Sequence, residues 1–396
     1  MSFDPAQLDQ CVGCGLCLSS CPTFDITRLE QHGPRGRIVG MRLVQDGSFG
    51  LTEPGVVDAL ETCVQCRACE AVCPSDVEFG ALMEQARSDL EDARSSDGRT
   101  NEARRLSARG LLGLVRRPRL LRLATWLLLI AQRLRLDRIL PEALQVRRRL
   151  TRVDVRRARR SPVPMADVHL FRGCVMDQWF AGVHTASERV LEASGHQVDG
   201  SRRSACCGAL HLHAGQKGEA RRLAVRTVDA YADAEGPIVV NSAGCGAAMR
   251  EYGRLLGTPE ADAFAARVRD FGELVDLPPG SAVAPRRVVW QAPCHLRFVQ
   301  GVDDATKRAL ESVEGLTVLE PDDGHSCCGA GGAYSLTQPE FSRQMGEQKL
   351  AALDATDAET VVSANPGCIL QLARGGRQVE HIAEVLAAAL PPDASS

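Results

Sequence analysis

The chain has 396 residues, with 47 basic against 50 acidic side chains and a formal net charge of −3. This length exceeds what one hydrophobic core usually organises, so two or three domains are expected. The nearly balanced charge excludes the strongly one-signed character that would by itself favour nucleic acid or an acidic substrate.

The N-terminus and the cysteine content both indicate the cellular compartment. The first residues lack the basic and apolar regions of an export signal, and no run of about eighteen apolar residues occurs. Many of the sixteen cysteines have no obvious disulfide partner, and free thiols of this number are typical of a reducing compartment. We therefore expect a cytoplasmic protein without a membrane-spanning helix.

Eight of the cysteines lie in two copies of one motif near the N-terminus. Each copy reads C-x2-C-x2-C-x3-C-P, the run that binds bacterial [4Fe-4S] clusters. The two-residue gaps let three thiolates converge on one cluster, while the fourth cysteine lies beyond a turn and reaches the other cluster. The expected ligand sets are therefore crossed. The first is Cys11, Cys14, Cys17 and Cys73, and the second is Cys63, Cys66, Cys69 and Cys21.

Zinc and disulfides explain these eight cysteines less well. A zinc site typically uses paired C-x2-C units with a finger-length spacer, without the third cysteine or the following proline. Disulfide frameworks belong to small exported proteins. We predict two [4Fe-4S] clusters in an α+β, largely helical, dicluster ferredoxin-like domain at residues 1–95.

Residues 96–162 are strongly basic and are expected to form a helical linker. Between positions 104 and 160 the chain has eighteen arginines, no lysine, three acidic residues and many leucines. Basic amphipathic helices of this kind lie on anionic membrane surfaces or dock against acidic partners. Alternatively, the leucines pack on the protein's own core and the arginines are solvated. All three interpretations stay open on the sequence alone.

The other eight cysteines repeat with a period of about 120 residues. The first set is Cys174, Cys206, Cys207 and Cys245, and the second is Cys294, Cys327, Cys328 and Cys368. Corresponding members are offset by 120 to 123 positions, and Gly-Ala follows both vicinal pairs. This agreement predicts an internal duplication, with repeats at residues 163–279 and 280–392.

Short runs rich in β-branched residues come before several of these cysteines, at residues 168–171, 238–240, 288–290 and 361–362. Helical patterns alternate with them, for example at residues 185–193 and 218–232. The alternation predicts an α/β domain with a parallel sheet, in which ligands bind beyond the carboxyl ends of the strands. Four thiolates per repeat suffice for a further iron–sulfur cluster or a zinc ion. Redox-active thiols and plain buried cysteines are the alternatives.

Three histidines lie close to these cysteines in the sequence. His295 directly follows Cys294, and His211 and His213 follow the first vicinal pair. They could line a quinone or substrate pocket or supply a proton near neutral pH, or simply be hydrogen-bonded at a turn. No Gly-rich dinucleotide motif or P-loop follows a strand, so the chain is not expected to bind its own flavin or NAD.

Taken together, these motifs resemble the iron–sulfur subunits of bacterial glycolate oxidase, within the wider group of proteins with Cys-Cys-Gly repeats. The resemblance rests on the two N-terminal motifs and on residues 32–38, 242–253, 327–337 and 364–368. Heterodisulfide reductase subunits, which also belong to this wider group, have a fifth cysteine per repeat. Here Ala248 and Gln371 stand at those positions, so the non-cubane cluster of those proteins is not expected.

The resemblance implies an electron-transfer subunit of a glycolate dehydrogenase complex. FAD would belong to partner subunits that oxidise glycolate to glyoxylate, and electrons would pass through this chain to quinone or another acceptor. The complex is expected at the inner face of the cell membrane, in contact with an anionic surface and with no nucleic acid. No catalytic residue is expected here, and the chain alone should not oxidise substrate. Alternatives are a subunit for D-lactate or glycerol 3-phosphate oxidation, and a zinc-binding scaffold.

Overall fold

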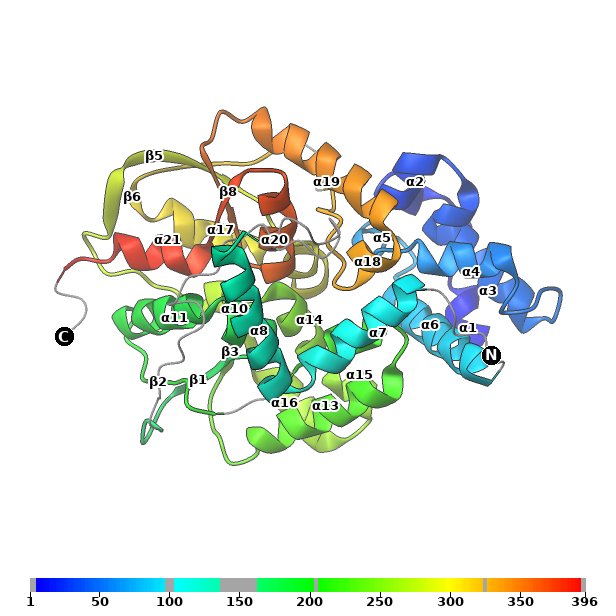
Figure 1. Ribbon diagram of the computed structural model, residues 1–396, viewed down its shortest axis with the longest axis horizontal. Helices are drawn as coiled ribbons and strands as arrows, with labels where there is room; N and C mark the ends of the chain where they lie inside the picture. Colours follow the sequence, from blue (N-terminus) through cyan, green and yellow to red (C-terminus); the bar gives the residue numbers. More distant parts are fainter. Residues whose placement is uncertain (1–4, 97–102, 136–161, 203–205, 323–325, 393–396) are drawn as a thin grey trace.

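The computed structural model describes residues 5–96, 103–135, 162–202, 206–322 and 326–392. Figure 1 shows the N-terminal helices at one end, both sheets toward the other, and two helices of the basic segment across the middle. None of the helices within these ranges is long and apolar enough to cross a membrane.

Residues 5–96 form short helices around a small core and contain no strand. Prolines stand at the start of four of these helices, where the missing N–H is not needed. The core contains Leu8, Met41, Leu60 and Met83, and cysteines pack against it. The expectation of a largely helical domain is confirmed. The elements are α1 (Pro5–Asp9), η1 (Leu16–Leu18), α2 (Pro22–Thr27), η2 (Glu30–His32), α3 (Pro34–Gln45), α4 (Pro54–Glu61), α5 (Ala68–Ala71) and α6 (Phe79–Ser96).

The basic segment begins with two helices, α7 (Ala103–Val115) and α8 (Pro118–Arg133). Their inner sides are packed, since Leu112, Leu121 and Leu129 are each at most 3% exposed. Trp179, at the end of α10 (Val175–Trp179), donates from Nε1 to the Thr125 hydroxyl of α8 at 3.0 Å. The remainder of the basic segment, residues 136–161, lies outside the described residues.

The first repeat contains a four-stranded parallel sheet with the order β2-β1-β3-β4. Its strands are β1 (Val168–Phe171), β2 (Val198–Asp199), β3 (Ile238–Val240) and β4 (Val268–Asp270). Its other helices are α11 (Ala181–Ala193), α12 (Ala209–His213), α13 (Lys217–Ala230), α14 (Ala243–Arg250), α15 (Tyr252–Leu256), α16 (Pro259–Arg267) and η5 (Phe271–Leu274).

The second repeat has the equivalent sheet, in the order β6-β5-β7-β8 and again parallel. Its strands are β5 (Ala282–Trp290), β6 (Glu314–Leu319), β7 (Thr360–Ser363) and β8 (Gln378–His381). Its helices are η6 (His295–Gln300), α17 (Asp303–Glu311), α18 (Tyr334–Thr337), α19 (Pro339–Asp354), α20 (Pro366–Arg374) and α21 (Ile382–Ala389). The matching strand orders confirm the duplicated α/β fold.

The two repeats share one hydrophobic core and meet at the carboxyl ends of β3 and β7. The Ala243 amide donates to the Ala364 carbonyl at 3.1 Å, and His381 Nε2 donates to the Asn241 carbonyl at 3.0 Å. Core residues of both sheets, such as Trp290, pack in one cluster. Because the cysteines follow these strand ends, this contact brings the two cysteine sets to one side of the double sheet.

Candidate functional site

The first N-terminal cysteine group lies close to the surface. The group is Cys11, Cys14, Cys17 and Cys73, the first of the two predicted ligand sets. All four line a small cavity of about 30 Å³, which Cys69 of the other set also lines. Cys14 is exposed and the other three of the group are half-buried.

The second N-terminal group is buried. A cavity of about 20 Å³ is lined by Cys21, Cys63, Cys66 and Cys69. Burial raises the pKa of the Cys66 and Cys69 thiols well above the ordinary value. Thiolates are therefore costly at this place unless a positive charge compensates them. Cys21 comes from the first motif and its three neighbours from the second, as the crossed scheme requires.

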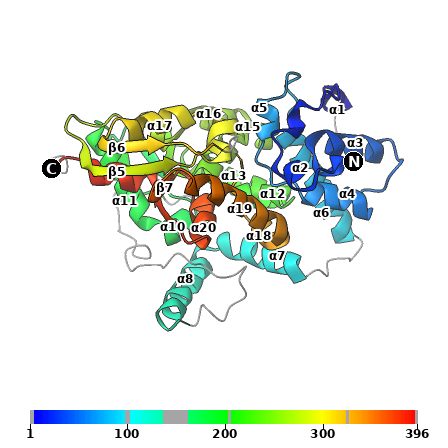
Figure 2. The ribbon, with the colours of Figure 1, turned by 90° about the horizontal axis from the view of Figure 1, so that it is seen from above.

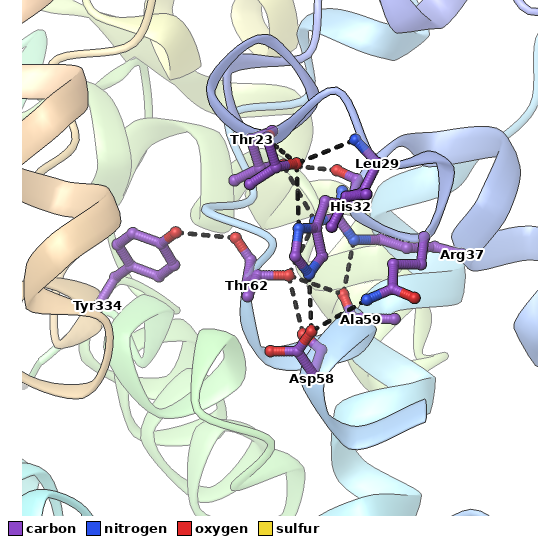
Figure 3. Close-up of polar contacts among 10 residues, drawn as sticks. Thr23, Leu29, His32, Arg37, Asp58, Ala59, Thr62 and Tyr334 are labelled. Carbon is purple, nitrogen blue, oxygen red and sulfur yellow. Dashed lines mark hydrogen bonds and ion pairs between the residues drawn. The ribbon is translucent and has the colours of Figure 1, made fainter. Parts of the chain in front are cut away.

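Arg37 of α3 supplies such a positive charge (Figure 3). Its side chain is 1% exposed and donates from Nη1 toward Cys21 Sγ at 3.8 Å. Its other donors reach the Ala59 carbonyl at 2.7 Å and the hydroxyls of Thr23 and Thr62 at 3.0 and 3.2 Å. Among the described residues no carboxylate forms an ion pair with it. A buried guanidinium needs a nearby anion, and a cluster held by four thiolates is one, so this environment fits a [4Fe-4S] cluster.

His32 holds the loop that carries Cys21 (Figure 3). Its ring bonds to the Asp58 carboxylate at 2.7 Å and to the Thr27 hydroxyl at 3.1 Å. Its carbonyl accepts from the Thr23 hydroxyl at 2.7 Å and from Cys21 Sγ at 3.5 Å. The segment at residues 32–38 thus positions the buried cysteine group and supplies a positive charge beside it. This segment carries part of the family resemblance, but its sequence alone indicates no role for it.

The loop between Cys63 and Cys69 docks into the junction of the two repeats. His213 Nδ1 donates to Gln65 Oε1 at 2.6 Å, and His295 Nε2 donates to the Gln65 carbonyl at 2.9 Å. The two imidazole rings are 5.4 Å apart. Arg87 of α6 donates to the carbonyls of His213, at 2.7 Å, and of Cys63. Burial is the main cause that lowers the pKa of both histidines, which favours their neutral forms.

The cysteine set of the first repeat converges at the ends of β1, β2 and β3. Cys207 Sγ and Cys245 Sγ are 3.2 Å apart. A hydrogen bond from Cys174 is the main cause that lowers the pKa of Cys206 well below the ordinary value. The Gly208 amide also donates to Cys206 Sγ at 3.5 Å. These contacts favour the ionised form of Cys206.

The set of the second repeat has equivalent sulfur and amide contacts, but here the second cysteine of the vicinal pair has the lowered pKa. Cys328 Sγ and Cys368 Sγ are 3.0 Å apart, and the Gly329 amide donates to Cys327 Sγ at 3.4 Å. A hydrogen bond from Cys327 is the main cause that lowers the pKa of Cys328. Gly329 has φ +77°, and a Cβ there would lie 2.6 Å from the Ser342 carbonyl oxygen. The glycine after the vicinal pair is thus required by both conformation and space.

The second set lies directly against the buried N-terminal group. Cys294, Cys327 and Tyr334 pack in one cluster with Val64, and Cys66 packs against it. The Tyr334 hydroxyl donates to the Thr62 carbonyl at 2.8 Å, which joins α18 to the N-terminal domain (Figure 3).

Both C-terminal sets open into one large cavity of about 580 Å³. It is lined by all eight cysteines of the repeats, together with His213 and His295. Apolar side chains of α7 and α8, including Leu111, Leu114 and Leu128, also line it. The sequence predicted that the cysteines lie at strand ends, but the participation of the basic helices was not predicted.

Comparison with known proteins agrees with this arrangement. Residues 7–77 match the family described as a 4Fe-4S dicluster domain, and residues 168–250 and 288–373 each match the cysteine-rich domain family. The "Probable glycolate oxidase iron-sulfur subunit" of Bacillus subtilis (strain 168) is 34% identical over 409 residues, covering 94% of this chain and 90% of its own length. The chain belongs to the family of glycolate oxidase iron–sulfur subunits.

Two further relatives show how far the likeness extends. The "Glycolate oxidase iron-sulfur subunit" of Escherichia coli (strain K12) is 33% identical over 400 residues, covering 97% of this chain and 94% of its own length. "Lactate utilization protein A" of Geobacillus kaustophilus (strain HTA426) is 32% identical over 234 residues, which is 55% of this chain and 98% of that protein. The similarity to the glycolate oxidase subunits therefore extends over nearly the whole chain, whereas the similarity to the lactate utilization protein covers just over half of it.

Proposed function

We propose that this chain carries electrons from the FAD of a partner subunit, which oxidises glycolate to glyoxylate, to a quinone. The observation that carries the proposal is the uninterrupted series of cysteine groups, from the exposed Cys14 to the cavity between the repeats. Nearly full-length similarity to glycolate oxidase subunits supports glycolate over D-lactate, because the lactate utilization relatives match just over half of the chain.

The surface around Cys14 is where electrons would arrive. Val12 and Leu16 flank this cysteine and are 72% and 57% exposed. Apolar side chains beside an exposed cluster ligand favour docking of a redox partner, which brings its cofactor close to the cluster. Arg35 holds the loop by donating to the Gly13 carbonyl at 3.0 Å and pairing with Glu30 at 2.6 Å.

Bound [4Fe-4S] clusters would supply one-electron acceptors at the two N-terminal groups. The charges near the two groups would then favour electron transfer from the surface group to the buried group. Arg37 makes the buried group more electropositive, whereas the arginine beside the surface group is neutralised by Glu30. Val64 and Cys66 place the buried group against Cys294 and Cys327, so the C-terminal sets are the next stage.

The C-terminal sets would hold further clusters in preference to zinc. Hydrogen bonds from neighbouring thiols lower the pKa of Cys206 and Cys328, which suits either metal centre. Cys294 and Cys327 lie directly against the buried N-terminal group, so a redox-active cluster there would extend the series of electron carriers, which zinc would not. Metal analysis separates the two, because a zinc scaffold would contain zinc and little acid-labile sulfide beyond the N-terminal domain.

A direct test uses the purified chain without its partner. It should contain both N-terminal clusters and no flavin, and it should not reduce an artificial dye with glycolate. Addition of the FAD-binding partner should restore activity. Robust glycolate oxidation by the flavin-free single chain would overturn its assignment as an accessory subunit.

A further inference from the structure

We infer that the cavity between the repeats is the binding site of a lipid-soluble quinone, which reaches it through the hairpin of α7 and α8. This inference rests on the proposed function, because it names the place where the electrons leave the chain. Reduction of one quinone to a quinol takes two electrons and two protons. The electrons come from the oxidation of one 2-hydroxy acid, and the protons come from solvent.

The size of the cavity is the first observation. The cavities at the two N-terminal cysteine groups measure about 30 and 20 Å³, whereas the cavity at the two C-terminal sets measures about 580 Å³. The volume lies in the range that is typical of small-molecule sites.

The lining of the cavity suits an aromatic ring with two carbonyl oxygens. Its walls are mainly apolar and include Leu111, Leu114, Leu128 and Trp179. Polar side chains that can donate hydrogen bonds to carbonyl oxygens occur at a few positions. They are Ser335, Asn365, Gln371 and Arg374. His213 and His295 also line the cavity, but the N–H group of each is already bonded to Gln65. A mainly apolar cavity with a few polar groups is typical of cofactor and substrate pockets.

The outer face of α8 explains why the occupant is lipid-soluble. Leu120, Leu123, Leu127 and Ile130 follow one another at helical spacing and are 44%, 58%, 59% and 50% exposed. Figure 2 shows α8 projecting from the body, so neighbouring elements of the described chain leave this side open. The helix is therefore apolar toward the cavity and also toward the outside. Such a helix is stable in a lipid interface, and a quinone dissolved there would have a short apolar path inward.

The charges on the hairpin agree with a membrane containing anionic lipid. Arg116 and Arg117 lie between α7 and α8, Arg119 and Arg122 lie in the first turns of α8, and all four are exposed. Arg116 also pairs with Glu219 at 3.2 Å. Basic residues close to an anionic leaflet are attracted to it. The apolar face of α8 and these arginines lie close together, which is the combination that interfacial helices use.

The test compares two neighbouring positions on α8. Leu128 lines the cavity, whereas Leu127 is exposed on the outer face. Leu128→Trp fills the cavity and should weaken equilibrium binding of a short-chain, water-soluble benzoquinone at least about tenfold, which corresponds to 1.4 kcal/mol. Leu127→Trp should bind this probe as the wild type does. Leu114→Trp, on the α7 side of the cavity, is the second filling variant in case Leu128→Trp does not fold.

Reoxidation of dithionite-reduced protein gives a second readout. The filling variants should lose quinone-dependent reoxidation and keep reoxidation by ferricyanide, which reacts at the surface. Equal quinone binding in all variants, or loss in Leu127→Trp as well, would overturn the site. Glycolate-driven reduction by the partner tests the proposed function separately, because it does not need the quinone cavity.

Discussion

Replacing Arg37 by glutamine should lower the reduction potential of the buried N-terminal cluster. The guanidinium lies 3.8 Å from Cys21 Sγ, is fully buried, and has no carboxylate partner among the described residues. Its charge is therefore compensated mainly by the cluster and its thiolates. Reduction adds a negative charge to the cluster, and the cation stabilises that reduced state.

The size of the shift follows from Coulomb's law. Unit charges 3.8 Å apart interact by about 4 kcal/mol at an effective dielectric constant of about 20. The added electron is shared over the whole cluster, so about half of this, roughly 2 kcal/mol, acts on the potential. For a one-electron couple this corresponds to a fall of about 80 mV, since about 59 mV is a tenfold change.

The assay is a redox titration of the two clusters followed by electron paramagnetic resonance. Arg35→Gln is the matched control, because Arg35 lies near the surface cluster, is partly exposed and already pairs with Glu30. It should shift the potential much less. Arg37→Lys keeps the positive charge and should restore most of the potential. A potential unchanged in Arg37→Gln, or lowered equally in Arg37→Lys, would refute the electrostatic role.

Three further predictions concern the ligands, the domain contact and the hairpin. Cys21→Ser should damage the cluster of Cys63, Cys66 and Cys69, and spectra showing damage confined to the cluster of Cys11, Cys14 and Cys17 would refute the crossed scheme. Gln65→Ala removes the side-chain bonds to His213, the last residue of α12. The contact between the N-terminal domain and α12 should weaken by about 1 to 3 kcal/mol, which would be measured as faster amide exchange in α12. Unchanged exchange would contradict this. Replacing Arg116, Arg117, Arg119 and Arg122 by glutamine should weaken flotation with acidic liposomes at low salt and leave both clusters intact. If the wild type and this variant float equally, the membrane interpretation fails.

Local patterns predicted the repeat fold well. The run at residues 168–171 is β1, and the run at residues 238–240 is β3. The helix expected at residues 218–232 is α13, which ends at Ala230. Spacing alone also indicated that the cysteines follow strand ends, because parallel strands place their carboxyl ends at one edge of the sheet.

Contacts between distant segments could not be predicted. Gln65 meets His213 and His295, which are 148 and 230 positions away. The sequence does not distinguish Arg37 from the other arginines, because its burial depends on how α3 packs against α4. The sequence left three interpretations of the basic helices open. The structure buries Leu121 and exposes Leu127 on the same helix, so core packing and an outward apolar face coexist.

Anaerobic mixing tests whether this chain receives electrons from a flavoprotein. The iron-loaded chain, its FAD-binding partner and glycolate are combined, and cluster reduction is followed by electron paramagnetic resonance. We expect at least about eight iron and eight sulfide per chain, and reduction only when partner and glycolate are both present. Clusters that stay oxidised in the complete mixture, while dithionite reduces them, would contradict it.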